Sequence, residues 1–132
     1  MGNFSRNIFV SAVIGIAFGT IPGGAAVAQS LSRSTPCRTI SSAVDTNDAQ
    51  KVLPILKYAI KAFDELDIKN IKLGNVPIMP PMTSDGKSGL VAMVSVHCRA
   101  NPAETFGSSI DFVYDGVRGM QEDVGLIPMR KE

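Results

Sequence analysis

Two cysteines, Cys37 and Cys98, constrain this chain more than any other feature of its sequence. They are the only cysteines in 132 residues, and they lie far apart. A bond that closes a loop of this length is worth about 4 kcal/mol in the chain-entropy model. A domain this small has a thin hydrophobic core, so a covalent tie of that size would be a large share of its stability. Whether the tie forms depends on the compartment that the protein reaches.

The first residues bear on that compartment, because residues 1–28 have the pattern of a cleavable secretory signal peptide. Arg6 supplies a positive start, Ile8–Ile21 is mostly apolar, and Ala26-Val27-Ala28 supplies small residues for cleavage. A retained anchor is the less favoured alternative, because the apolar run is shorter than the roughly 20 residues that span a bilayer. We expect residues 29–132 to form one exported domain with its core at about residues 37–126, periplasmic and without a membrane attachment.

Export has a direct consequence for the cysteines. In an oxidising compartment, two cysteines in a small domain are expected to pair. The sequence therefore predicts one intramolecular disulfide between Cys37 and Cys98, which leaves no thiol for catalysis.

The charges of the exported part are balanced. Arg6 accounts for the surplus of 13 basic over 12 acidic side chains, so the rest of the chain is formally neutral near pH 7. This balance argues against nucleic acid as a partner, because phosphate binding needs a basic surplus. In acid the carboxylates lose their charge around pH 4, and the same domain becomes strongly positive.

Apolar residues recur at spacings of three and four in two segments, a pattern typical of amphipathic helices. The first is Val52–Leu66, whose early part contains Pro54; a proline there is tolerated in a first turn and otherwise kinks the helix. The second opens at Asn101-Pro102-Ala103-Glu104, with Asn as the N-cap and Pro at the first helical position. Gly125 and Pro128 are expected to end it.

Two shorter segments complete the expected fold. Cys37–Val44 fits one or two helical turns, and Leu90–Val96 fits either a strand or a buried helix. We favour a helix for Leu90–Val96 because no other segment alternates convincingly enough to pair with a strand. The sequence therefore predicts an all-α fold, a small helical bundle stapled by one disulfide. Its expected core consists of Leu56, Ile60, Phe63, Val94, Phe106, Ile110, Val113 and Val117.

Residues 70–89 are expected to form a long apolar loop. Pro77, Pro80 and Pro81 exclude a regular helix, and Asp85-Gly86 is expected to be a turn. A loop of this length in a small domain is uncommon and often functional. Three of its apolar side chains are the candidate surface for binding a client or partner: Ile78, Met79 and Met82. The alternative is that the loop lies flat over the core as a long connection.

Chemistry-bearing motifs are scarce. His97 is the only histidine, and it has no second histidine or free thiol with which to bind zinc. No phosphate-binding loop or metalloprotease motif is present. Three carboxylates, Asp64, Glu65 and Asp67, are expected to form a solvated acidic patch rather than an acid/base pair. The sequence predicts no catalytic residue, metal or cofactor, and hence a protein that is not an enzyme.

The order of these landmarks resembles the HdeA/HdeB-like family of small periplasmic acid-stress chaperones. The resemblance covers about residues 35–122 and rests on Cys37, a helix, the long loop, Leu90–Cys98 and Asn101-Pro102. It implies a possible homodimer at neutral pH that acid loosens, so that apolar surface binds unfolding proteins. The physical logic suits this chain, since neutralised carboxylates lose their pairing while a disulfide limits dispersal. The alternative is an exported interaction or immunity-type module that binds one specific protein partner.

Overall fold

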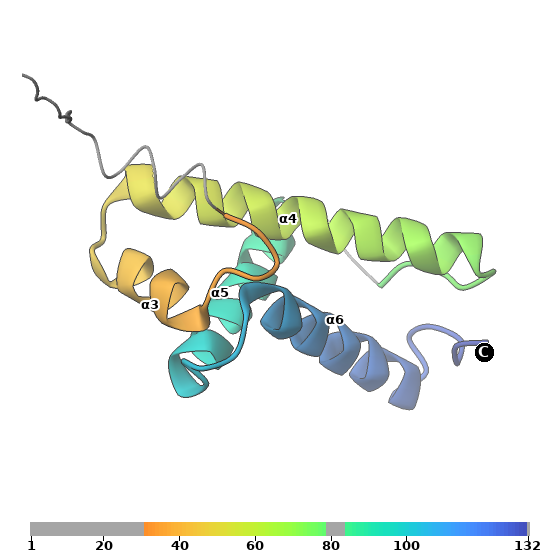
Figure 1. Ribbon diagram of the computed structural model, residues 1–132. Helices are drawn as coiled ribbons and strands as arrows, with labels where there is room; N and C mark the ends of the chain where they lie inside the picture. Colours follow the sequence, from red (N-terminus) through yellow and green to blue (C-terminus); the bar gives the residue numbers. More distant parts are fainter. Residues whose placement is uncertain (1–30, 79–83, 132) are drawn as a thin grey trace, which may run out of the picture. The chain divides into compact units, whose positions relative to one another are not determined.

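The computed structural model describes residues 31–78 and 84–131 (Figure 1). The described residues form four helices and no strand. The helices are α3 (Cys37–Asp45), α4 (Ala49–Lys72), α5 (Ser84–Ala100) and α6 (Phe106–Asp123). The predicted all-α fold is therefore confirmed, including a helix rather than a strand at Leu90–Val96. The predicted signal peptide, residues 1–28, lies outside the described residues. In the described part of the chain, no helix combines the length and apolarity needed to cross a membrane.

Helix α5 is the central element of the domain. It packs against α3, α4 and α6, and Figure 1 shows it passing behind α4 with α3 and α6 to either side. Its buried residues include Leu90, Val94 and Cys98. Its contacts with α6 and α3 are the most extensive between any two helices, so its surface decides which apolar side chains are covered and which remain open.

Helix α4 is longer than the predicted segment at both ends. Asp48 caps its start, with a carboxylate oxygen that accepts a hydrogen bond from the Gln50 amide at 2.9 Å. Gly74, at φ +85°, ends it in a Schellman arrangement, in which the Gly74 and Asn75 amides bond to carbonyls of the last turn. Pro54 lies in the second turn and removes only one donor, whose acceptor would be the solvent-exposed Gln50.

The buried face of α4 is rotated from the predicted one. Ile55, Ala59 and Phe63 are buried, whereas Leu56 and Ile60 are only partly buried and pack at the edge of the core. Ala59 and Ala62 on this face leave room for a neighbouring helix. Of the eight predicted core residues, five are buried: Phe63, Val94, Phe106, Ile110 and Val113; Leu56, Ile60 and Val117 are partly buried.

The prediction of a loop over residues 70–89 was wrong at both ends. Asn70 belongs to the last turns of α4, and the segment Asp85-Gly86 lies in the first turn of α5 rather than in a turn. The connection between α4 and α5 is thus residues 73–83, and it contains all three prolines.

The predicted start of α6 at Asn101-Pro102 was also wrong, because α6 begins at Phe106. Thr105 is the N-cap and accepts a hydrogen bond from the Ser108 amide at 3.2 Å. The preceding residues are instead held by the N-terminal segment: the Cys37 amide donates to the Glu104 carbonyl at 2.8 Å, and the Phe106 amide donates to the Thr35 carbonyl at 2.8 Å. A helix from Pro102 onward would have broken this pairing.

Candidate functional site

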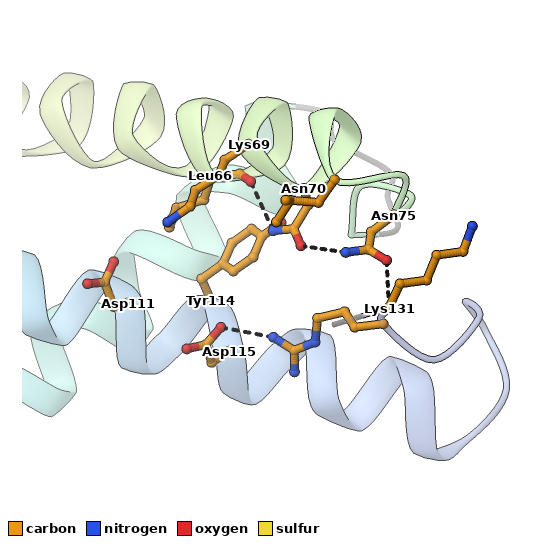
Figure 2. A pocket seen from close by; sticks show the side chains of 10 residues that line it. Leu66, Lys69, Asn70, Asn75, Asp111, Tyr114, Asp115 and Lys131 are labelled. Atoms are coloured by element: carbon orange, nitrogen blue, oxygen red, sulfur yellow. Dashed lines mark hydrogen bonds and ion pairs between the residues drawn. The ribbon is translucent and has the colours of Figure 1, made fainter.

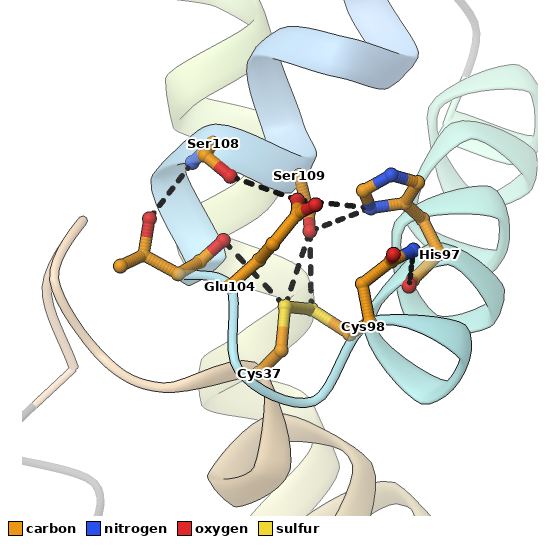
Figure 3. The surroundings of a disulfide bond; sticks show 8 residues. Cys37, His97, Cys98, Glu104, Ser108 and Ser109 are labelled. Carbon is orange, nitrogen blue, oxygen red and sulfur yellow. Dashed lines mark hydrogen bonds and ion pairs between the residues drawn. A yellow bond between two sulfur atoms is a disulfide. The ribbon is translucent and has the colours of Figure 1, made fainter.

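The predicted disulfide between Cys37 and Cys98 is present (Figure 3). Both cysteines are fully buried, and their Cα atoms are 4.7 Å apart. The bond ties the first residue of α3 to the last turn of α5. Because α5 contacts the other three helices, this one bond restrains the centre of the domain.

The only histidine lies beside the disulfide. His97 Nδ1 is 2.8 Å from the Ser109 hydroxyl, which in turn lies 3.1 Å from Cys37 Sγ and 3.4 Å from Cys98 Sγ. Glu104 Oε1 approaches the same His97 nitrogen at 3.9 Å. A serine-hydrolase triad needs the serine and the carboxylate on opposite ring nitrogens, so this group does not have that geometry. Ser109 is also fully buried, and its contacts are those of a packing element.

A groove between α5 and α6, hereafter the α5–α6 groove, has an almost wholly apolar lining. Its volume is about 500 Å³, within the range of ligand pockets in proteins. Helix α5 lines it with Ala92, Met93, Val96, His97 and Ala100, and α6 lines it with Phe112, Val113, Gly116 and Val117. His97 is the only lining side chain that carries a polar group.

Large apolar side chains at the α5–α6 groove are open to solvent. Met93 is 48% exposed, Val96 is 68% exposed and Phe112 is 62% exposed. The Phe112 ring stacks on His97, with ring centroids 4.3 Å apart. Burying such side chains against another molecule would be favourable by on the order of 1–2 kcal/mol each. Contiguous apolar surface of this kind marks interaction sites.

A second apolar groove lies on the other side of α5, between α3, α4 and α5. Its volume is about 390 Å³, and it includes Ile40, Val52 and Val91. Ala92 and Val96 line both grooves. The exposed ridge of α5 therefore joins the two grooves into one apolar surface.

Of the three predicted contact residues, only Ile78 belongs to the described part of the chain, and it does not line the α5–α6 groove. Ile78 is 2% exposed and belongs to the hydrophobic core. Its amide donates to Asp67 Oδ1 at 3.0 Å. Ile78 would reach a client only if the domain opened. Met79 and Met82 lie outside the described residues.

Sequence reasoning missed the residues that do line the α5–α6 groove, although a signal for them was present. Phe112 is a large aromatic residue beside Asp111, off the apolar stripe of its helix. Met93 and Val96 are also in excess of what one buried face of α5 needs. Apolar residues outside the buried face of a helix indicate that the helix has a second apolar face, which is exposed to solvent.

Asp67 corrects the expectation of a solvated acidic patch. Glu65 is exposed and Asp64 pairs with Lys87 at 2.7 Å, but Asp67 is buried. Asp67 Oδ1 also accepts a hydrogen bond from the Tyr114 hydroxyl at 2.7 Å. The carboxylate therefore joins α4, α6 and the connection after α4 from inside the domain.

The surroundings of Tyr114 form a polar pocket of about 350 Å³ (Figure 2). The Asn70 amide donates to the Tyr114 hydroxyl at 3.2 Å. Burial raises the pKa of the Tyr114 hydroxyl well above its ordinary value, and the hydrogen bond and negative charge of Asp67 raise it further, whereas Arg118 opposes the shift. This tyrosine therefore stays protonated far into the alkaline range.

Tyr114 makes stability sensitive to alkali. A pKa that is raised in the folded state contributes stability below the unfolded value, near 10, and that contribution is lost as the pH rises above it. We expect a Tyr114→Phe variant to be less stable at neutral pH, because it lacks the bond to Asp67, yet to lose stability less steeply above about pH 10. Urea unfolding between about pH 9 and pH 11 measures how the free energy of unfolding of each protein changes with pH. Equal slopes in the two proteins would contradict this account.

Neither a search for metal-binding groups among the described residues nor a comparison with known proteins points to another site. The described residues contain no group of three or more His, Cys, Asp or Glu side chains placed to hold a metal ion. No protein-family model matches the chain, and neither a curated protein nor a solved structure matches it significantly. The α5–α6 groove and the buried polar groups are therefore the features that bear on function.

Proposed function

We propose that this protein is an exported holdase that binds unfolding periplasmic proteins in acid. The observation that carries the proposal is the α5–α6 groove, whose lining is apolar and whose Met93, Val96 and Phe112 are open to solvent. Methionine and aromatic side chains provide adaptable apolar contacts without one fixed shape. This is the surface that a protein needs in order to hold many different unfolded chains.

Ion pairs between separate elements support an acid response. Asp45 at the end of α3 pairs with Arg99 at the end of α5, at 2.6 Å. The hydrogen bond from Arg99 lowers the pKa of Asp45. The stability from this pair is therefore present above the ordinary carboxyl value near 4, and it is lost as the pH falls through the lowered value. Lys87–Asp64, between α5 and α4, is a second tie that depends on a charged carboxylate.

The disulfide fits the same proposal. Acid weakens the ionic ties and adds positive charge, but it does not reduce the bond between Cys37 and Cys98. A stapled domain can open locally and expose apolar surface without dispersing. The accumulated positive charge would keep the loaded protein soluble.

The alternative function is a module that binds one specific protein partner. The observation in its favour is that the α5–α6 groove is already open while the domain is folded. The two functions differ in what acid does: a holdase gains client binding as the pH falls, whereas a module that recognises a folded shape binds best at neutral pH.

We expect a Met93→Ser, Phe112→Ser double variant to lose client protection. Its affinity for aggregating proteins at about pH 2 should fall roughly tenfold or more, because each lost apolar contact is worth on the order of 1 kcal/mol. Its thermal unfolding at pH 7 should barely change, since both side chains are about half exposed or more. Light scattering of an acidified periplasmic extract measures the protection.

A matched control tests the location of the surface. Ile68 and Ile71 of α4 are 52% and 53% exposed and lie outside the α5–α6 groove. An Ile68→Ser, Ile71→Ser variant should protect clients as well as the unaltered protein does. Equal losses in the two variants would show that protection does not depend on this groove. If the unaltered protein protects nothing at pH 2, the holdase proposal fails and the single-partner module becomes the better account.

A further inference from the structure

The chain after α6 folds back and is fastened to the domain. This C-terminal strap, residues 124–131, begins at Gly125, whose φ of +79° turns the chain in a Schellman arrangement. Ile127 is then buried at 5% exposure. Farther along, the Lys131 amide donates to the Asn75 side-chain oxygen at 2.8 Å, which joins the strap to the end of α4 (Figure 2).

One carboxylate accepts three of the strap's hydrogen bonds. Glu122 Oε2 accepts hydrogen bonds from the Arg130 backbone amide and from Arg130 Nε, both at 3.1 Å. Arg130 also bonds to Asp115 at 3.2 Å, but Asp115 is far more exposed than Glu122, whose side chain is only 5% exposed. Glu122 is therefore the main polar anchor of the strap.

The same carboxylate neutralises a buried cation. Arg118, one turn earlier on α6, is fully buried, and its Nε is 3.3 Å from Glu122 Oε2. None of the guanidinium nitrogens of Arg118 has a hydrogen-bond acceptor of good geometry among the described residues. A guanidinium stays charged at every pH that a protein meets. Glu122 thus carries one negative charge between two positive ones.

Protonation of Glu122 would reverse the electrostatics of this cluster. The charged groups that the described elements bring to it are Arg118 and Asp115 of α6, Arg130 of the strap, and Asp67 of α4, which reaches it through Tyr114. With Glu122 neutral, Arg118 and Arg130 would face each other across an uncharged carboxyl group. Like charges repel, and a buried charge without a partner is costly. The partner that can move away is Arg130, because its side chain is partly exposed whereas that of Arg118 is fully buried.

We propose that Glu122 is an acid-sensitive latch whose protonation releases the C-terminal strap from α6 and α4. Release would uncover Ile127 and open the polar pocket, whose lining includes Arg130, Lys131, Leu66 and Leu73. The structure would thereby gain apolar surface next to α6 in acid. The role of this latch as an acid trigger rests on the proposed holdase function, but the movement of the strap does not.

The test is a measurement of the strap itself. In the full exported domain, the methyl resonance of Ile127 and the exchange of the Arg130 and Lys131 amides report whether the strap is docked. In the unaltered protein, we expect docked signals at pH 7 and a released strap at about pH 2, the acid condition of the client assay. In Glu122→Gln, which imitates the protonated acid, we expect release already at pH 7, with amide protection lower by roughly tenfold or more.

Two further variants keep the test decisive. Asp123→Asn removes the same charge from the next residue, which is exposed, and should leave the strap docked. Arg130→Gln removes the strap's cation while Glu122 still neutralises Arg118, so it should release the strap even if Glu122→Gln fails to fold. A strap that stays docked in a folded Arg130→Gln variant, or in the unaltered protein at about pH 2, would overturn the proposal. Release without client protection would instead refute the holdase function and leave the latch standing.

Discussion

Replacement of both Cys37 and Cys98 by serine is expected to lower the free energy of unfolding by about 4 kcal/mol. The bond closes a loop with a sequence separation of 61, and its loss returns that loop's freedom to the unfolded chain. Native proteins have a total stability of only about 5–15 kcal/mol, so the variant should lose a large share of its stability. Urea unfolding followed by circular dichroism measures the change.

The reduced protein is the natural control for this experiment, because it contains the same atoms apart from two hydrogens. It should be destabilised by a similar amount, which would show that the tie and not the serine side chains carries the effect. The new hydroxyls would lie next to Ser109, where they can exchange hydrogen bonds. A loss below about 1 kcal/mol in both proteins would contradict the role given to the disulfide here.

Removal of the buried carboxylate by Asp67→Ala is expected to cost about 3–5 kcal/mol. The substitution leaves the Tyr114 hydroxyl and the Ile78 amide without their acceptor. Hydrogen bonds to a charged group contribute about 1.5–3 kcal/mol each, and buried donors left unpaired are costly. We expect Asp67→Asn to restore part of the loss, because an amide oxygen can still accept one of these bonds.

A neighbour on the same helix provides the comparison. Asp64 lies one turn before Asp67 and pairs with Lys87 near the surface, with its side chain 46% exposed. Because exposed pairs contribute little, Asp64→Ala should cost less than about 1 kcal/mol. Thermal and urea unfolding of the two variants at pH 7 make the comparison. If both variants lost a similar amount of stability, the buried hydrogen bonds of Asp67 would contribute no more than the exposed ion pair of Asp64.

These two predictions concern the two ways in which the domain is held together. The disulfide does not respond to protons, whereas the pair of Asp45 and Arg99 loses its contribution in acid. A protein tied in both ways can loosen in acid and still return to its fold when the pH rises. That combination is what the proposed holdase function requires, and the α5–α6 groove supplies its contact surface.

Local pattern was enough to predict the helical architecture. The spacing of apolar residues indicated the helices around Phe63 and Ile110, because a 3.6-residue period depends only on neighbours in the chain. The context of Cys37 and Cys98 predicted their pairing, because oxidised cysteines in a small domain have few other fates. Gly125 ended α6 as expected, since it supplies the left-handed conformation that a helix end favours.

The sequence pattern could not predict which side chains of different helices contact one another. Asp67 has the composition of a surface residue and becomes buried only because Tyr114 and Ile78 bring donors to it. Asn101-Pro102 has the features of a helix start, yet the pairing of Glu104 with Cys37 holds that segment in another conformation. In both cases contacts between distant residues outweighed a local preference of about 1 kcal/mol.

The same distinction applies to function. By itself the sequence determined a small all-α domain with one disulfide and balanced charge, since these properties follow from residue types and their spacing. Only the tertiary structure decided that Ile78 is core and that Phe112 and Val96 are open beside α5. The physical reason is that exposure depends on packing between helices. A side chain is covered or left open by helices far from it in the chain, and the local spacing of apolar residues does not show which of them are covered.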